Sequence, residues 1–308
     1  MTPFEGIYPA LVTPLTSAGN LNEAALEKLV EFHAAAGVDG LYLGGTTGEG
    51  LLLDLATRQR LVERVVSTRG GSASGGKCAR GRLKVIVHVA ACSTDDAVAL
   101  ARYAEEAGAD AVSAIPPVFY KIGFDGVHEY YRRIAAATRL PFYVYYIPAL
   151  SGLAFSIEEL GRLFALPNVA GVKFSDYNLF LLHALRERYP EKIVFSGEDQ
   201  VFLPALVMGA HGAIGLTLNL MPRLYVALYR AFRSGNLAVA QRLQFQANRV
   251  IEVVIRHGSI AAAKAIMGML GVDCGPCRGP LATIAGPAYD RLRQDLEQVG
   301  FFDAVFIT

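Results

Sequence analysis

The chain of 308 residues is long enough for one large domain or for two domains of ordinary size. Its 29 Lys and Arg residues nearly balance its 28 Asp and Glu residues, and the formal charge of +1 argues against the broad basic surface of a nucleic-acid-binding protein. Hydrophobic residues make up 53% of the chain and charged residues only 19%, which excludes a disordered protein, yet no apolar run reaches the roughly 18 residues of a membrane span.

Eight short apolar segments along the chain have the length of parallel strands that are buried on both faces. Three of them come directly after a helical pattern that ends in a glycine, at Gly37, Gly108 and Gly209, where a helix C-cap needs a left-handed residue. In chain order the expected strands are residues 7–12, 40–43, 84–89, 111–115, 142–145, 171–173, 193–196 and 213–216.

Amphipathic helices are expected between these strands, for example over residues 22–35 and 94–107. Ser93 and Ser156 are placed as N-caps, and Ser156 has the spacing of a capping box. Eight strands alternating with helices predict a closed (β/α)8 barrel, the TIM barrel. After residue 220 the pattern is helical only, over residues 222–256, 260–270 and 288–299. We therefore expect a barrel at 1–220 and a C-terminal helical extension at 221–308, packed together as a single structural unit.

The segment 69–82 is rich in glycine and serine and is basic. It separates a helix from the third strand, so it is expected at the N-terminal face of the barrel, away from the face where barrel enzymes do chemistry. A mobile linker is favoured over a catalytic lid.

The four cysteines, at positions 78, 92, 274 and 277, are too few and too scattered for a disulfide framework. The chain also begins without a secretory signal, so we expect a cytoplasmic protein. Cys274 and Cys277 have the spacing of half a zinc site or of a redox motif, but no second such pair exists, and a chance spacing is favoured. With no close pair of histidines either, we expect no metal.

A glycine-rich turn follows the second expected strand, with the sequence GGTTGE at residues 44–49. The hydroxyls of Thr46 and Thr47, together with exposed backbone N–H groups, would make a neutral cradle for an anion, and a carboxylate fits better than a phosphate because no lysine follows. A simple helix-capping turn is an equally good interpretation of the motif alone.

Lys173 ends the sixth strand and Tyr145 ends the fifth. Each has an ordinary interpretation, as a solvated lysine and a packed tyrosine. Neighbouring parallel strands end at the same mouth of a barrel, however, where a desolvated amine is a nucleophile and a phenol carries protons. The pair is better explained together, as a covalent catalyst with its proton carrier.

The strings GGTTGE at 44–49, YYIPALSG at 145–152 and GVK at 171–173 resemble the pyruvate-dependent class I aldolase family of dihydrodipicolinate synthase and N-acetylneuraminate lyase. The resemblance covers nearly the whole chain, including ALVMGA at 205–210 and AKAIM at 263–267. It implies a β/α barrel with C-terminal helices, no cofactor, a 2-keto acid or pyruvate as the small-molecule partner, and a homotetramer.

By this resemblance Lys173 forms a Schiff base with the keto carbon, Tyr145 shuttles a proton to and from the substrate hydroxyl, and Thr46 and Thr47 hold the pyruvyl carboxylate. The remaining positions that match the family pocket, and that would bind the rest of the substrate, are Ser175, Gly197, Asp199 and Gln200.

The synthase branch has an arginine where this chain has Ala149 and Leu150, and a tyrosine where it has Phe119, so the lyase branch is favoured. Two departures separate the chain from that branch as well: Gln200 replaces a glutamate and Leu216 replaces a serine. These departures suit a tail pocket for a shorter or less hydroxylated 2-keto acid, or for a modified sialic acid. The resemblance itself favours N-acetylneuraminate or a close relative as the substrate. The alternatives are a 2-keto-3-deoxy sugar acid aldolase or dehydratase, a synthase-like enzyme and, least favoured, a non-catalytic keto-acid binding protein.

Overall fold

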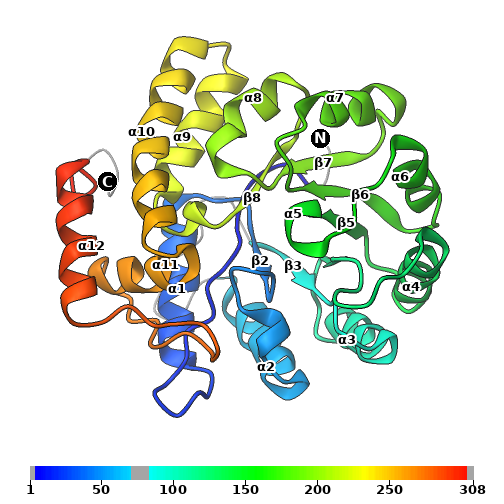
Figure 1. The fold of residues 1–308 in the computed structure, drawn as a ribbon, viewed down its shortest axis with the longest axis horizontal. Helices are drawn as coiled ribbons and strands as arrows, with labels where there is room; N and C mark the ends of the chain where they lie inside the picture. The colour runs from blue at the N-terminus through cyan, green and yellow to red at the C-terminus, as the bar shows by residue number, and fades with distance from the viewer. Residues whose placement is uncertain (1–3, 71–82, 304–308) are drawn as a thin grey trace.

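A computed structural model describes residues 4–70 and 83–303 of the chain. Its eight strands form one parallel sheet in the order β1-β8-β7-β6-β5-β4-β3-β2. A parallel bridge between Ala10 and Tyr42 brings the two edges together, so the sheet curls into a barrel with helices around it (Figure 1). The predicted TIM barrel is confirmed.

The strands lie where the apolar segments predicted them. Two have the expected bounds, and the others differ at one or both ends because ladder pairing, and not hydrophobicity, decides where a strand stops. The strands are β1 Gly6–Pro9, β2 Gly40–Leu43, β3 Lys84–His88, β4 Ala111–Ala114, β5 Phe142–Tyr146, β6 Val169–Phe174, β7 Ile193–Ser196 and β8 Gly212–Gly215.

Helices and short 3₁₀ turns connect these strands, and their ends carry the predicted caps. Gly37 closes the first helix in the left-handed region at φ 76°, Ser93 accepts two backbone N–H groups, and Ser156 forms a capping box with Glu159. The elements are α1 Glu23–Ala36, η1 Gly50–Leu52, α2 Leu55–Thr68, α3 Thr94–Glu106, α4 Phe124–Ala136, α5 Pro148–Ser151, α6 Ile157–Phe164, α7 Leu179–Arg188, η2 Asp199–Val201, α8 Phe202–Val207 and η3 Thr217–Asn219.

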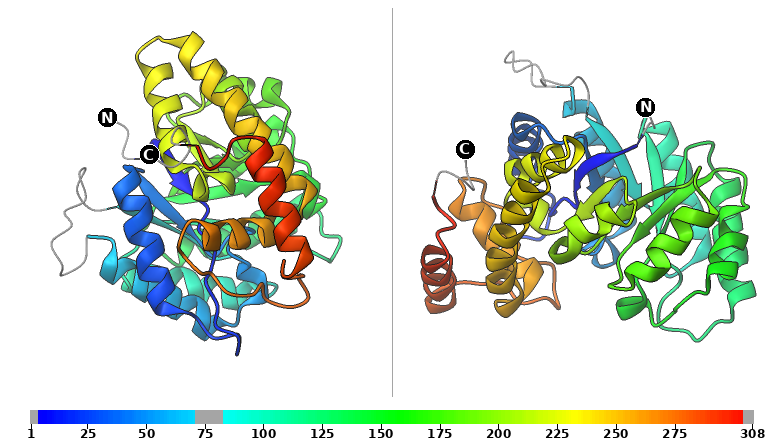
Figure 2. Two further views of the ribbon diagram at one scale, coloured as in Figure 1. Left: turned by 90° about the vertical axis from the view of Figure 1, so that its left-hand side faces the viewer. Right: turned by 90° about the horizontal axis from the view of Figure 1, so that it is seen from above.

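The C-terminal part is helical, as expected, with α9 Pro222–Arg233, α10 Leu237–Arg256, α11 Ser259–Met269 and α12 Pro287–Gln298. The predicted stretch 222–256 is two helices, because Gly235 takes a φ of 79° and Asn236 then caps α10. Helices α10, α11 and α12 gather on one side of the barrel (Figures 1 and 2). The division of the chain at residue 220 stays a prediction.

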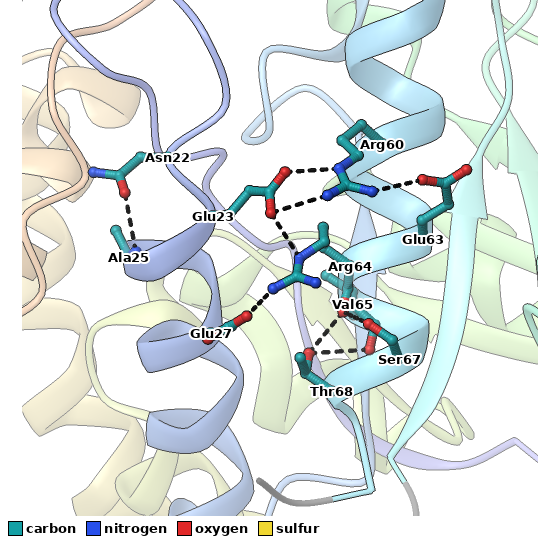
Figure 3. Close-up of polar contacts among 10 residues, drawn as sticks. All are labelled: Asn22, Glu23, Ala25, Glu27, Arg60, Glu63, Arg64, Val65, Ser67 and Thr68. Atoms are coloured by element: carbon teal, nitrogen blue, oxygen red, sulfur yellow. Dashed lines mark hydrogen bonds and ion pairs between the residues drawn. The ribbon is translucent and has the colours of Figure 1, made fainter. Parts of the chain in front are cut away.

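Helices α1 and α2 are joined on the outside of the barrel by a network of exposed charges (Figure 3). Arg60 binds Glu23 at 2.7 Å and Arg64 binds the other oxygen of the same carboxylate at 2.9 Å. Exposed pairs of this kind contribute little to stability. The helices are held mainly by their buried faces, such as Leu26 and Leu29 on α1 and Leu61 on α2.

The interior of the barrel is filled by aromatic rings in its N-terminal half. Tyr8, Tyr143 and Phe195 come from three different strands, and the ring of Phe195 lies 5.2 Å from that of Tyr8 and 5.6 Å from that of Tyr143 between centroids. Phe4 closes the bottom with an edge contact to Tyr143 at 5.6 Å. Among the described residues, these rings pack the N-terminal end of the barrel interior.

Most of the segment 69–82 lies outside the described residues, so its role as a linker stays a prediction. Arg69 itself is described: its side chain is 2% exposed and forms an ion pair with Asp110 at the start of β4. The predicted place at the N-terminal face is therefore correct for the end of the segment that is described. Within residues 4–70 and 83–303, no helix is both long enough and apolar enough to cross a bilayer.

Candidate active site at the C-terminal end of the barrel

Lys173 lies inside the barrel near its C-terminal end, at the fifth position of β6. It pairs in register with Tyr145 on β5 and with Phe195 on β7, and it is 4% exposed. Its Nζ lies 3.8 Å from the centroid of the Tyr145 ring and 4.6 Å from that of Tyr42. The amine is thus held between two aromatic rings, and the solvated-lysine interpretation is wrong.

Tyr145 links the lysine to the glycine-rich turn. Its phenol oxygen lies 3.5 Å from the Thr46 hydroxyl, and its ring makes edge contacts with Tyr42 and His88 at 6.1 Å and 6.0 Å between centroids. The structure therefore brings Lys173, Tyr145 and Thr46 together as expected, with an amine, a phenol and a hydroxyl around one space.

Backbone hydrogen bonds within the turn 44–50 hold it in one conformation. Glu49 donates its N–H to the Thr46 carbonyl at 3.1 Å, and Gly50 donates to the Gly45 carbonyl at 3.1 Å. A Cβ on Gly50 would lie 1.7 Å from the Gly44 oxygen, so no larger residue fits without moving the backbone. Thr46 is exposed to the barrel mouth and Thr47 is buried.

The turn does not cap an α-helix, which removes that interpretation of the motif. It leads only into the 3₁₀ turn η1, whose N-cap residue Glu49 makes no side-chain cap. The next helix, α2, begins later and is capped by Asp54, which accepts the Thr57 N–H at 2.7 Å. The hydroxyls of Thr46 and Thr47 are thus left to serve another purpose.

His88, at the end of β3, is a site residue that the sequence reasoning missed. Its Nδ1 lies 3.0 Å from the Gly44 carbonyl and its Nε2 lies 3.3 Å from the Ile115 N–H. A carbonyl only accepts and an N–H only donates, so the ring is the neutral tautomer with its proton on Nδ1. Burial, with the charges of Arg58 and Lys173 nearby, holds the pKa of His88 well below its usual value. The strand-end rule that found Lys173 would also have found His88.

Ser175 and Gly197 lie side by side after β6 and β7. The Ser175 Oγ is buried and has no hydrogen-bond partner among the described residues. A Cβ at position 197 would lie 1.9 Å from that Oγ, so only glycine leaves the hydroxyl its space. A buried hydroxyl without a partner among the described residues, beside the space that Gly197 leaves, is typical of a site that binds a polar group.

Asp199 and Gln200 follow Gly197 but point to different partners. The Asp199 carboxylate accepts the Thr217 N–H at 2.7 Å and the Thr217 hydroxyl at 2.6 Å. Burial raises the pKa of Asp199, and the Thr217 bonds oppose that rise. Gln200 instead donates to the hydroxyl of Tyr177. Thr217 is a second residue that the sequence reasoning missed.

A cavity of about 320 Å³ opens beside the turn 44–50. Thr46 and His88 line its inner part and Leu150 its rim, while Ile260 and Leu281 reach it from the C-terminal extension. A larger hollow of about 490 Å³ lies between the C-terminal ends of α3 and α4, at the opposite end of the barrel from Lys173. Its lining residues belong to the outer surface. The smaller cavity is the candidate entrance to the substrate site, because Thr46 and His88, which contact Tyr145, line it, whereas Lys173 and Tyr145 themselves do not.

The two cysteines of the C-x-x-C spacing are free and buried. Burial raises the pKa of Cys274 to about 12, so its thiol stays protonated at neutral pH and is a poor metal ligand. Among the described residues, no three His, Cys, Asp or Glu side chains are grouped as a metal site. Cys78 lies outside the described residues.

The chain is similar to known proteins over nearly its whole length. Residues 3–299 match the model of the dihydrodipicolinate synthetase family. The N-acetylneuraminate lyase of Rhizobium meliloti is 37% identical over 295 residues, which cover 96% of this chain and 95% of that protein. The N-acetylneuraminate lyase of an Enterobacter species is 36% identical over 296 residues, which cover 96% of each chain.

Solved structures show the same likeness. The sialic acid aldolase of Ruminococcus gnavus, whose catalytic lysine mutant has also been solved, superposes with a TM-score of 0.90 at 29% identity, covering 98% of this chain and 99% of that one. The Clostridium difficile protein CdNal, solved with mannosamine, gives a TM-score of 0.89 at 29% identity, covering 97% of this chain and all of the other.

Proposed function

Because the chain belongs to the dihydrodipicolinate synthetase family, whose members are class I aldolases and carbon–carbon lyases, we propose that it cleaves N-acetylneuraminate, or a closely related 2-keto acid, to release pyruvate. The observation that carries the proposal is the buried amine of Lys173 between the rings of Tyr42 and Tyr145, with the Tyr145 phenol oxygen 3.5 Å from the Thr46 hydroxyl. The curated relatives support N-acetylneuraminate as the first substrate to test.

In the proposed reaction the Lys173 Nζ attacks the keto carbon of the substrate, and loss of water gives an imine. The protonated imine accepts the electron pair of the breaking carbon–carbon bond, while the Tyr145 phenol relays the proton of the substrate hydroxyl that becomes the aldehyde. Protonation of the resulting enamine and hydrolysis by water then release pyruvate and free Lys173. No cofactor enters this sequence.

The substrate carboxylate is proposed to lie in the turn 44–50, bound by the hydroxyls and amides of Thr46 and Thr47. Hydroxyls and backbone N–H groups fixed before the substrate arrives stabilise an anion without reorganising. This neutral cradle agrees with a chain whose charges balance to +1.

The other end of the substrate is expected near Ser175, Gly197, Asp199 and Gln200. Asp199 already accepts two hydrogen bonds from Thr217. Leu216, the residue before Thr217, has no hydroxyl that could bind a hydroxyl of the substrate. These two features favour a second candidate, a 2-keto-3-deoxy sugar acid with fewer hydroxyls in its tail. A synthase-like reaction is disfavoured because Leu150 lines the cavity rim where a second carboxylate would need a cation.

The imine is tested by reducing it with borohydride in the presence of pyruvate and measuring the mass of the intact protein by mass spectrometry. The native chain should gain one covalent adduct, Lys173→Ala none, and the control Lys192→Met, at the opposite end of the barrel, the same adduct as the native chain. Equal labelling of Lys173→Ala and the native chain would contradict the lysine assignment.

The substrate is tested by a coupled assay of pyruvate release on N-acetylneuraminate and on 2-keto-3-deoxygluconate. The substrate with the higher kcat/KM decides between the two candidates. If no sugar acid tried gave any release of pyruvate, the result would favour a non-catalytic keto-acid binding protein instead. The homotetramer and the cytoplasmic location stay predictions, tested by light scattering and by cell fractionation.

A further inference from the structure

A buried ion pair joins the glycine-rich turn to the C-terminal extension. The Lys264 Nζ on α11 lies 2.7 Å from the Glu49 Oε1, and the two side chains are 2% and 0% exposed. Neither residue has a part in the proposed chemistry. The pair therefore lies in the wall of the site, outside the reaction itself.

Each side chain also makes one hydrogen bond to the backbone of the segment that follows α11. Lys264 also donates to the Pro276 carbonyl at 2.6 Å, and the second Glu49 oxygen accepts the Arg278 N–H. Burying two charges costs solvation that apolar residues of the same size would avoid. A contribution to the stability of the fold therefore does not explain why a buried ion pair is present here. An explanation is that the pair fixes one arrangement of the backbone around it.

The geometry that the pair fixes is that of the turn 44–50. Glu49 has a φ of 58°, a left-handed conformation that a non-glycine residue adopts only when its surroundings hold it. Its own N–H bonds the Thr46 carbonyl at 3.1 Å, which belongs to the same peptide group as the Thr47 amide. A rotation at Glu49 would thus turn the amide that is proposed to bind the substrate carboxylate.

We infer that Glu49 and Lys264 are positioning residues, which hold the Thr46–Thr47 cradle in the orientation that binds a 2-keto acid carboxylate. The C-terminal extension is then part of the substrate site, through α11 and the segment that follows it. This inference depends on the proposed function, because it assigns the cradle to the carboxylate of that substrate.

The test measures borohydride labelling of the full chain as a function of pyruvate concentration, which gives a half-saturating concentration and a maximal rate. In Lys264→Met the buried Glu49 carboxylate loses its counter-charge, so we expect it to leave its place. The half-saturating concentration should rise at least about tenfold, with the maximal rate within about threefold of the native value. The double variant E49Q/K264M leaves no buried charge at these two positions. It should recover most of the affinity for pyruvate that K264M loses, since a glutamine oxygen still accepts the Arg278 N–H.

The control is Asp110→Asn, which breaks the Arg69–Asp110 pair at the other end of the barrel. It should lower the melting temperature and leave the half-saturating concentration unchanged. A K264M protein that melts earlier but binds pyruvate as well as the native chain would overturn the inference, as would a double variant no better than K264M.

Should K264M not fold, Glu49→Gln and the double variant supply the same measurement, and an unchanged half-saturating concentration in Glu49→Gln overturns the inference. Absence of any label on the native chain would instead refute the proposed function, and the inference with it. The two failures are therefore distinguishable.

Discussion

At the N-terminal end of the barrel the polar side chains bind the backbone of the strands, whereas at the C-terminal end several of them face one another across an open space. At the first end Asp39 accepts the Ile7 N–H at 2.9 Å, Asp110 accepts the Val85 N–H at 2.8 Å, and His211 accepts the Val194 N–H at 3.0 Å. These bonds satisfy backbone amides at the second position of β1, β3 and β7.

At the C-terminal end, too, a side chain binds the backbone where a strand stops: Arg58 donates to the His88 and Ala90 carbonyls at the end of β3. It has polar groups in addition to those, namely the Lys173 amine, the Tyr145 phenol and the unpaired Ser175 hydroxyl. Polar groups beyond what the backbone requires mark the end of the barrel that does chemistry. Variants at one end should therefore affect activity, and variants at the other end should affect stability.

The largest expected effect separates two tyrosines of β5 that lie two positions apart. Tyr145→Phe removes the proposed proton carrier and should lower kcat by about 10²- to 10⁴-fold, while the imine with pyruvate still forms. Tyr143→Phe, in the aromatic layer below, should leave kcat unchanged. Steady-state rates and borohydride labelling check both, and an equal loss of kcat in the two variants would break the distinction between the ends.

At the N-terminal end, Asp110→Asn should destabilise the chain by about 3 kcal/mol, because it leaves the buried Arg69 guanidinium with a weaker partner. Chemical denaturation measures this loss, and kcat measured below the melting temperature should stay native. A fall in kcat with no change in stability would show that this end takes part in the reaction.

The pH dependence of stability gives a smaller effect at the same end. Burial, with the charge of Arg186 nearby, lowers the pKa of His211 to about 4, whereas a histidine in an unfolded chain titrates near pH 6.5. Between about pH 6.5 and pH 4 the unfolded chain binds a proton that the folded chain does not, so the free energy of unfolding falls by at most about 1.4 kcal/mol per pH unit as the pH decreases.

His211→Asn removes this titration and should flatten that part of the profile. Denaturation at four pH values from 7.5 to 4.5 makes the comparison. A slope equal to that of the native chain would rule out His211 as a source of the pH dependence.

The smallest effect is expected on the outside of the barrel, where Arg60 bridges α1 and α2 through exposed carboxylates (Figure 3). Arg60→Ala should change neither the activity nor, within error, the melting temperature, because water screens these charges. Lys264→Met is the matched contrast, since it removes one partner of a fully buried pair. A large loss of stability in Arg60→Ala would show that the network does more than exposed pairs usually do.

The sequence predicted the barrel because twice-buried strands and glycine caps are local signals, and β2 and β7 even have the expected bounds. It predicted Lys173, Tyr145 and Thr46 as neighbours because parallel strands end at one face. It missed the break at Gly235, although the residue was visible, because the apolar period continued across it. It could not predict the contacts of Glu49 with α11, or of Asp199 with Thr217, because no local pattern says which distant side chains meet.

The Glu49–Arg278 contact spans 229 positions of the chain, and this has a consequence for synthesis. The turn that carries Thr46 leaves the ribosome before its partners on the extension do. Contacts so far apart in sequence form late, after the loop between them has closed. A chain whose synthesis has not reached the extension would contain Lys173 but lack the contacts that hold the turn 44–50, so the proposed substrate cradle is complete only after residues 264–278 have been made.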